Sequence, residues 1–342
     1  MRFASAEHPI AVAVDAAGRF LFVANWEAHS VSAYRIDASC GTLQPVPGSP
    51  FGSGRWPHSL VVAPSGRFLY TANGQSNDVS VFRIDPRTGA LEATAGSPYP
   101  ARNHPESVTL TPRGEFAYVC NGFSGDISAY RVDPETGALL EQAGSPFATG
   151  EKPLALAIDP LGAFAYVANR RFDVWAYRID AASGRLDPLA DSPFPAGRGP
   201  TAITVEPTGR FVYVANFKSD DIGAYRIDRA SGSLTQLEGS PYPCLGKVPI
   251  GIAADPLGTY LFVTNGESDG VAVYRVDAAS GVPAAVERAP FACGQMPCGV
   301  VADPSGRFLY AANWVSNDVS AYRIERATGA LTPIGVPQAL PA

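Results

Sequence analysis

Apolar and polar positions follow one another in short runs along this chain, and the same order of runs returns about every 48 residues. Each copy opens with a proline and a near-continuous apolar run such as IAVAV or SLVVA, which is typical of a strand buried on both faces. A DPxG-type turn leads to a second apolar run that ends in Asn, such as FLFVAN. The third run, VSAYRID or close to it, alternates like a half-buried strand, and a TG or SG turn precedes a short fourth run such as LTPI. Each copy therefore predicts four short antiparallel strands.

The copies number seven. Their opening prolines are Pro9, Pro57, Pro105, Pro153, Pro200, Pro249 and Pro297, and the sixteenth residue after each of them is Asn. A fixed period of this length indicates a repeat architecture. Four strands repeated seven times predict an all-β fold, a seven-bladed β-propeller that forms a single domain over residues 1–342. The predicted blades are residues 8–51, 56–99, 104–147, 152–194, 199–242, 248–291 and 296–337.

The two ends of the chain bear on how the ring closes. The first residues, MRFASAEHP, align with PFATGEKP before the fourth blade and contain no apolar signal core. We therefore expect the chain to begin in a loop between blades and to end after the last strand of blade seven. No strand is then left over to complete a blade made by the other end. The ring is expected to close by packing of blade seven against blade one, with both termini on one face.

Rare residue types gather on one predicted face. If the first strand of each blade lies nearest the axis, the loops after the second strands and between blades share a face, here called the top face. This face holds all four histidines, all three lysines and three of the four tryptophans: His8, His29, His58, His104, Lys152, Lys218, Lys247, Trp26, Trp56 and Trp314. An alternative explanation is that the tight turns of the other face tolerate few residue types, so that rare residue types would be found on the top face even without a ligand-binding role. We favour a ligand-binding top face.

Cations stand just before the opening prolines of blades two to six. They are Arg55, Arg102, Lys152, Arg198 and Lys247. Because the net charge is −6, a ring of cations at the mouth of the axis favours a small anionic ligand, a carboxylate or a phosphate, over a nucleic acid. A ring of solvated rim charges is the alternative. No apolar stretch approaches the roughly 18 to 20 residues of a membrane span, so no membrane partner is expected.

Aromatic residues are expected on another side of the same mouth. Trp26 and Trp314 occupy equivalent positions in blades one and seven, which become neighbours on closure, and Trp56 lies on blade two. With His8, these side chains are candidate ligand-binding groups, although each tryptophan can equally serve packing. An apolar wall that faces a cationic and imidazole wall suits a compact ring carrying an acid group.

Histidine chemistry gives the candidate catalytic residues. His104 and Glu106 flank Pro105, and residues two apart on an extended segment point the same way. His58 follows the opening proline of the neighbouring blade, and Arg102 is close by. A carboxylate that orients an imidazole makes a general base, and a cation stabilises an oxyanion, so the group suits attack of water on an ester or lactone carbonyl.

Two alternatives to this catalytic interpretation stay open. The histidines can be hydrogen-bonded loop residues without a chemical role. A zinc site of His8, His58 and His104 from three consecutive blades is also conceivable, because three imidazoles form a catalytic zinc set. No spacing motif supports it, and the sequence predicts no metal and no cofactor. The five cysteines, an odd number, imply no disulfide framework and favour a reducing compartment, here the cytoplasm. A monomer is expected.

Short sequence motifs of the repeat resemble those of a known family. LFVAN, AYVAN, VYVAN and LFVTN resemble the YVTN-type propeller repeat, and together with SAYRID, TGAL and GSPF they resemble the seven-bladed lactonase family typified by bacterial 6-phosphogluconolactonase. The resemblance covers essentially the whole chain and implies hydrolysis of a small phosphorylated or carboxylated lactone at the top-face mouth. The family also holds muconate-cycloisomerising relatives. A non-catalytic ligand- or protein-binding scaffold and an isomerase or cyclase acting on a small cyclic acid therefore remain alternatives.

Overall fold

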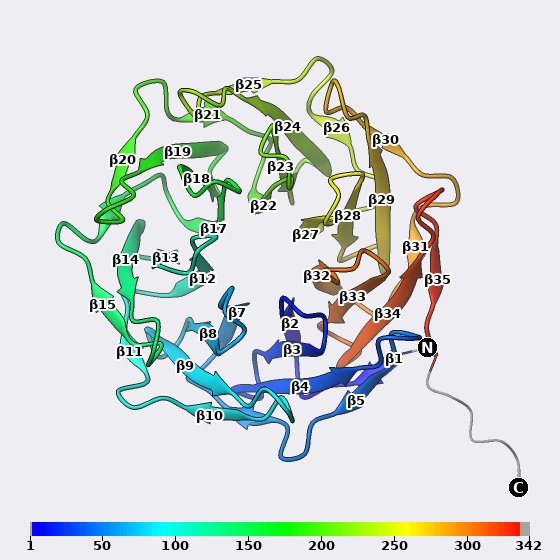
Figure 1. Ribbon diagram of the computed structural model, residues 1–342. Coiled ribbons are helices and arrows are strands. Elements are labelled where there is room, and N and C mark those ends of the chain that lie inside the picture. Colours follow the sequence, from blue (N-terminus) through cyan, green and yellow to red (C-terminus); the bar gives the residue numbers. More distant parts are fainter. Residues whose placement is uncertain (1, 336–342) are drawn as a thin grey trace, which may run out of the picture.

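The computed structural model describes residues 2–335 and has the seven-bladed, all-β propeller architecture that the repeat predicts. The blades are antiparallel sheets set radially around one axis (Figure 1). The strand nearest the axis in each blade is the proline-initiated one. These innermost strands are β2 (Pro9–Val14), β7 (Pro57–Val62), β12 (Pro105–Leu110), β17 (Pro153–Ile158), β22 (Pro200–Val205), β27 (Pro249–Ala254) and β32 (Pro297–Ala302). The predicted end of blade seven, at residue 337, lies outside the described residues.

The second and third strands carry the buried apolar residues. The second strands are β3 (Phe20–Asn25), β8 (Phe68–Asn73), β13 (Phe116–Asn121), β18 (Phe164–Asn169), β23 (Phe211–Asn216), β28 (Tyr260–Asn265) and β33 (Phe308–Asn313). The third strands are β4 (Ser30–Ile36), β9 (Asp78–Ile84), β14 (Asp126–Val132), β19 (Asp173–Ile179), β24 (Asp221–Ile227), β29 (Gly270–Val276) and β34 (Asp318–Ile324). Every residue of the second strands is buried, because each blade is covered by a neighbour on both faces.

The outer edge of each blade holds two short strands side by side on the third strand. The fourth strands are β5 (Leu43–Pro45), β10 (Leu91–Ala93), β15 (Leu139–Glu141), β20 (Leu186–Pro188), β25 (Leu234–Gln236), β30 (Pro283–Ala285) and β35 (Leu331–Pro333). The additional, fifth strands are β6 (Phe51–Gly52), β11 (Tyr99–Pro100), β16 (Phe147–Ala148), β21 (Phe194–Pro195), β26 (Tyr242–Pro243) and β31 (Phe291–Ala292). Each fifth strand pairs with the start of the third strand and covers backbone groups that the fourth strand does not reach.

Ring closure differs from the sequence-based expectation. The first described residues form β1 (Arg2–Ala4), which pairs antiparallel with β34 of blade seven through Arg2↔Ser320, Phe3↔Val319 and Ala4↔Asp318. β1 therefore takes the place that the fifth strands hold in the other six blades. The prediction that no terminal strand completes another blade was wrong, because Phe3 aligns with Phe147, which itself belongs to a strand and not to a loop.

The hydrophobic core is divided among the interfaces between adjacent blades. At the closure, Leu21 and Val23 of blade one pack with Phe308 and Tyr310 of blade seven, and Phe3 joins the same cluster. The hydroxyl group of Tyr310 also donates a hydrogen bond to the Gly41 carbonyl across the closure (2.9 Å). The equivalent tyrosines of blades two to five make the same bond to the next blade: Tyr70, Tyr118, Tyr166 and Tyr213. The closing interface is thus built like the others.

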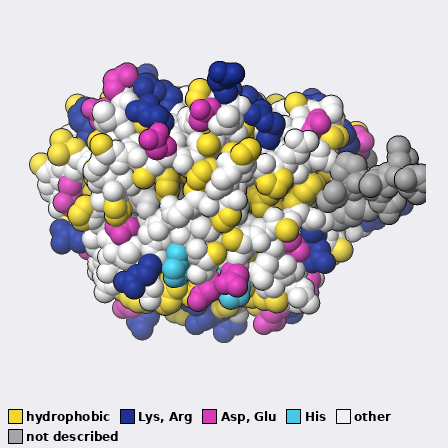
Figure 2. Space-filling view, turned by 90° about the horizontal axis from the view of Figure 1, so that it is seen from below, with side chains coloured by type: hydrophobic (Ala, Val, Ile, Leu, Met, Phe, Trp, Pro, Cys, Tyr) yellow, Lys and Arg dark blue, Asp and Glu magenta, His cyan; other side chains and the backbone are white. Residues whose placement is uncertain are grey.

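Lys and Arg side chains appear mainly toward the two faces of the disc when it is seen edge-on (Figure 2), while apolar side chains are scattered between them. Within residues 2–335, no helix is long and apolar enough to cross a lipid bilayer.

Candidate active site

A β-bulge lies at the top of each innermost strand. In blade three, Pro105 pairs with Asn121 and Ser107 pairs with Cys120, which leaves Glu106 without an opposite residue. The same shift in register follows the opening proline in all seven blades. Bulges re-aim side chains, and they are common at functional sites. The residue after the proline is therefore free to point out of the sheet, toward the axis.

The residue before the opening proline is distorted as well. Its backbone is left-handed, with φ of 62° at His104 and 57° at Lys152, a region that residues other than glycine rarely adopt. This turn brings His104 to the same side as Glu106 and Lys152 to the neighbouring position on blade four. The two distortions together place three functional side chains around one space.

That space is a cavity of about 650 Å³ at the top-face end of the axis. The residue after the opening proline lines it in every blade: Ile10, His58, Glu106, Leu154, Thr201, Ile250 and Cys298. His104 and Lys152 line it from the position before the proline, and Trp26 and Arg170 from the position after the Asn that ends the second strand. The cavity is therefore a shared product of all seven blades, but its imidazole, carboxylate, ammonium and guanidinium groups belong to blades two to four.

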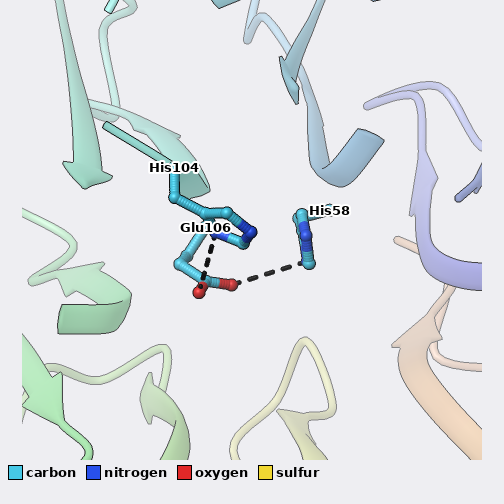
Figure 3. A group of neighbouring side chains, drawn as sticks. All are labelled: His58, His104 and Glu106. Atoms are coloured by element: carbon cyan, nitrogen blue, oxygen red, sulfur yellow. Dashed lines mark ion pairs between the residues drawn. The ribbon is translucent and has the colours of Figure 1, made fainter. Parts of the chain in front are cut away.

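Glu106 lies between two imidazole rings (Figure 3). Its Oε1 is 3.2 Å from His104 Nδ1, and its Oε2 is 3.5 Å from His58 Nδ1. The three side chains are only 12% to 16% exposed. The structure thus brings together three of the four predicted catalytic residues from the tops of β7 and β12.

Trp26 fixes the protonation of His58. The Trp26 indole Nε1 donates a hydrogen bond to His58 Nε2 (3.1 Å), and because indole can only donate, that imidazole nitrogen must carry a lone pair. The proton of His58 therefore lies on Nδ1, facing Glu106. Burial lowers the pKa of His58 to about 4, and the nearby His104 and Lys152 add to this against the opposing effect of Glu106. His58 is neutral at pH 7.

Glu106 stays ionised in spite of its burial. Burial alone raises the pKa of this carboxyl, but the hydrogen-bonding contact with His104 and the electrostatic effects of His58, His104 and Lys152 together hold it below its usual value. His104 stacks on Phe123, with ring centroids 4.1 Å apart. Its Nδ1 is buried and makes no well-aligned hydrogen bond within residues 2–335, so the Glu106 oxygen at 3.2 Å is its natural acceptor. With the proton on Nδ1, His104 Nε2 is free to accept a proton from a molecule in the cavity.

The alternative zinc set of three histidines does not form. His8 stacks on Trp314, with ring centroids 4.7 Å apart and planes within 5°, and it does not line the cavity. Ligand atoms of His58, His104 and Glu106 do lie within 4.8 Å of one another. A metal on His58 Nδ1 would, however, move the proton to Nε2, where it would face the Trp26 N–H group. The donor arrangement fits a hydrogen-bonded His–Glu–His group better than a metal centre.

The Trp26 bond gives a direct test of this arrangement. In Trp26→Phe, we expect the pKa of His58 to rise from about 4 by about one unit or more, because Nε2 loses its donor and the ring gains access to water. The imidazole C–H chemical shift, followed by NMR against pH and assigned with His58→Gln, measures the midpoint. Trp314→Phe is the matched control, because Trp314 stacks on His8. An unchanged midpoint in Trp26→Phe would refute the proposed tautomer.

Most of the predicted cations do not reach the cavity. Arg55, Arg198 and Lys247 stand two residues before their prolines and are exposed, and Lys247 Nζ pairs instead with Asp220 (2.7 Å). Arg102 stands three residues before its proline, and its guanidinium group lies 4.0 Å from Glu141 at the outer edge of blade three. Among the five, Lys152 alone lines the cavity, because it alone immediately precedes a proline. The expected convergence of all five cations is thus not observed.

Sequence reasoning missed a second cation, Arg170, whose guanidinium group lies over the Phe217 ring at 5.8 Å. Phe217 and Phe123 also line the cavity. Arg170 and Phe217 follow the Asn of their second strands, as Trp26 and Trp314 do. That shared repeat position was the available signal.

The predicted aromatic residues form one block. Trp26 stacks on Trp56, with ring centroids 4.4 Å apart, and approaches Trp314 at 5.0 Å. Of these three, Trp26 is the one that lines the cavity, while Trp56 and Trp314 pack around it. Cys298 also faces the cavity, but burial raises the pKa of its thiol to about 12, which leaves it unsuited to act as a nucleophile.

Comparison with known families agrees with the seven-bladed propeller fold. Residues 2–102, 94–199, 189–292 and 251–342 match the family described as lactonase, 7-bladed beta-propeller. The chain belongs to this lactonase family. No curated protein sequence matches the chain significantly.

Solved structures similar to this lactonase-family chain share its fold at low sequence identity. The hydrazine synthase of Kuenenia stuttgartiensis matches with a TM-score of 0.73 and 21% identity over 92% of this chain and 95% of that one. A Bacteroides uniformis protein provisionally assigned as a 6-phosphogluconolactonase matches with a TM-score of 0.75 and 22% identity over 89% and 90%. The periplasmic gluconolactonase of Pseudomonas aeruginosa matches with a TM-score of 0.69 and 24% identity over 82% and 84%. At these identities the likeness establishes the fold alone.

Proposed function

We propose that this protein is a lactonase-type hydrolase that opens a small anionic lactone in the top-face cavity. The observation that carries the proposal is the pairing of His104 with Glu106 at the cavity wall, 3.2 Å apart. An ionised carboxylate that holds the proton of one imidazole nitrogen leaves the other as a general base. The family to which the chain belongs supports lactone chemistry.

The proposed reaction uses groups that already face one another. His104 Nε2 takes a proton from water while the water oxygen attacks the lactone carbonyl carbon. Lys152 stabilises the resulting oxyanion, since its ammonium group lies over the same Phe123 ring (5.0 Å) on which His104 stacks. The ring C–O bond then breaks, and His104 returns the proton to the departing alkoxide oxygen. The products are one hydroxyl group and one carboxylic acid on the same molecule, and the acid releases its proton to solvent to leave a carboxylate.

The experiment that tests this proposal is hydrolysis of a lactone panel at constant pH. Lactones with a carboxylate, with a phosphate and with no charge are compared by titrating the acid released. We expect the charged lactones to be hydrolysed, and Glu106→Gln to lower kcat by about 10²-fold or more, since a glutamine amide no longer stabilises the protonated base. Glu151→Gln is the matched control, because Glu151 is exposed and pairs with Arg171. Failure to hydrolyse any member, or equal rates for both variants, would favour the non-catalytic scaffold.

We also propose that the protein works as a cytoplasmic monomer. All five cysteines are free, which suits a reducing compartment, although the Pseudomonas aeruginosa relative is periplasmic. Size-exclusion chromatography with light scattering tests the monomer, and a dimer mass would contradict it.

A further inference from the structure

The cavity continues downward as an apolar shaft along the innermost strands. Its lining reaches from Ile10 to Val12 on β2, from His58 to Leu60 on β7, and from Ile250 to Ile252 on β27. At about 3.3 Å per strand residue, these spans extend the cavity by roughly 7 Å below the residues that follow the opening prolines. Blades five, six, seven and one face it mainly with aliphatic and aromatic groups, together with the Thr201 hydroxyl and the Cys298 thiol, whereas the imidazole, carboxylate, ammonium and guanidinium groups stay on blades two to four.

Few polar groups in this shaft are free to bind a polyol. Two serines line it. The Ser59 hydroxyl oxygen accepts from the Val108 N–H group (3.4 Å), and the buried Ser107 hydroxyl group has no partner within residues 2–335, so it is available. Within the described residues, no Asn, Gln or Asp lines the cavity. The hydroxyl group of Thr201 already donates to the backbone carbonyls of Ala215 and Pro249 (3.2 Å each). A sugar placed here would bury most of its hydroxyl groups without partners, which is unfavourable.

The upper end of the shaft is built for an acid group. Lys152 and Arg170 are joined through their backbones, because the Arg170 N–H group donates to the Lys152 carbonyl (3.1 Å). Lys152 lies over the Phe123 ring and Arg170 over the Phe217 ring. Neither forms an ion pair with a carboxylate within residues 2–335, although both line the cavity. The two charged groups point to rings on opposite neighbouring blades. Lys152 therefore stays on the side of His104, which stacks on Phe123, and Arg170 is the cation left to bind a carboxylate.

From these observations we infer that the substrate is an amphipathic acid. It is a lactone that also carries a free carboxylate. This carboxylate binds Arg170, and Lys152 stays at the lactone carbonyl. An apolar arm enters the shaft between Ile10, Leu60 and Ile252. This inference rests on the proposed function and narrows it, since it selects lactones of apolar hydroxy acids that carry a second carboxylate over lactones of sugar acids. The cavity volume of about 650 Å³ is in the range of small-molecule sites.

Binding of two unreactive acids tests the inference without catalysis. Octanoate and gluconate carry the same charge, but octanoate has an apolar arm and gluconate a polyol chain. By isothermal titration calorimetry, we expect the wild-type protein to bind octanoate at least about 10-fold more tightly than gluconate. Equal affinities, or tighter binding of gluconate, would overturn the inference.

Variants locate the binding and separate the two proposals. Arg170→Gln should weaken octanoate binding about 10-fold or more, while Arg171→Gln, the matched control, should not, because Arg171 is exposed and pairs with Glu151. His104→Gln should keep octanoate binding and lose hydrolysis. Selective octanoate binding without hydrolysis of any lactone would overturn the proposed function and support this site. Hydrolysis accompanied by a preference for gluconate, or an unaffected Arg170→Gln, would overturn this site alone.

Discussion

Replacing His104 by glutamine is expected to lower kcat for lactone hydrolysis by about 10²- to 10⁴-fold, the usual contribution of a general base. Glutamine can still donate to Glu106, so the cavity wall is preserved, but it cannot take a proton from water. Initial rates for the best lactone of the panel, measured at saturating and limiting concentration, give kcat and KM separately. Because Arg170 binds the acid group in this proposal, KM should change little.

The matched control for this variant is His8→Gln. His8 holds the same repeat position on blade one, before Pro9, but stacks on Trp314 and does not line the cavity. Its replacement should leave kcat within about 2-fold of the wild-type value, and both variants should unfold within about 1 kcal/mol of the wild type. Hydrolysis should also survive a chelator. Full activity in His104→Gln would remove this residue from the mechanism.

The second large effect concerns ring closure. Phe3→Ala is expected to lower the free energy of unfolding by about 3 to 5 kcal/mol, the range for removing a buried phenylalanine side chain. Phe3 is 7% exposed and packs in the cluster that joins blades one and seven. The strand around it is also held by the Tyr34 hydroxyl group, which donates to the Ala4 carbonyl (2.5 Å), and by Arg2, which pairs with Asp318 (3.1 Å).

Urea unfolding followed by fluorescence measures this effect. Leu161→Ala is the control, because Leu161 is 87% exposed and its truncation should cost no more than about 0.5 kcal/mol. A loss below about 1 kcal/mol in Phe3→Ala would mean that packing alone closes the ring, as the sequence first suggested.

The fold could be predicted from the sequence because the patterns of the four main strands recur in all seven repeats, whereas the two- or three-residue fifth strands were not predicted. Because the opening Pro and the Asn that ends the second strand recur in all seven copies, one irregular blade could not change the strand assignment. The pairing of His104 with Glu106 could also be predicted, since the two residues flank Pro105 and the proline restricts the directions of their side chains. Arg102 and Arg55 were misplaced for a related reason. The bulge and the left-handed residue change the direction of the backbone here. A residue that stands one or two positions farther before the proline therefore points to the rim and not into the cavity.

Other features of the site and of the ring closure could not be predicted, because they depend on contacts between blades or on local turns that the repeat pattern by itself does not reveal. The hydrogen bond from Trp26 to His58 joins two blades, and its donor and acceptor lie 32 residues apart. β1 was missed because three residues are too short for a strand pattern, although Phe3 aligned with phenylalanines that begin fifth strands elsewhere. Arg170 was overlooked because two arginines stand together, and the direction of each is set by the turn that follows Asn169.

The pairing of β1 with β34 has a consequence for biosynthesis. Arg2 can pair only after Ser320 has been synthesised. At the usual 5 to 20 residues per second, roughly 15 to 60 s of translation separate the two partners. Sheets one to six can assemble from local contacts during that time, whereas the seventh cannot be finished until the earliest segment returns to it. In a nascent chain, the interface between blades one and seven therefore stays open until the end of synthesis. A bulky fusion placed directly before Arg2 would obstruct the pairing of β1 with β34, which is the last step of folding.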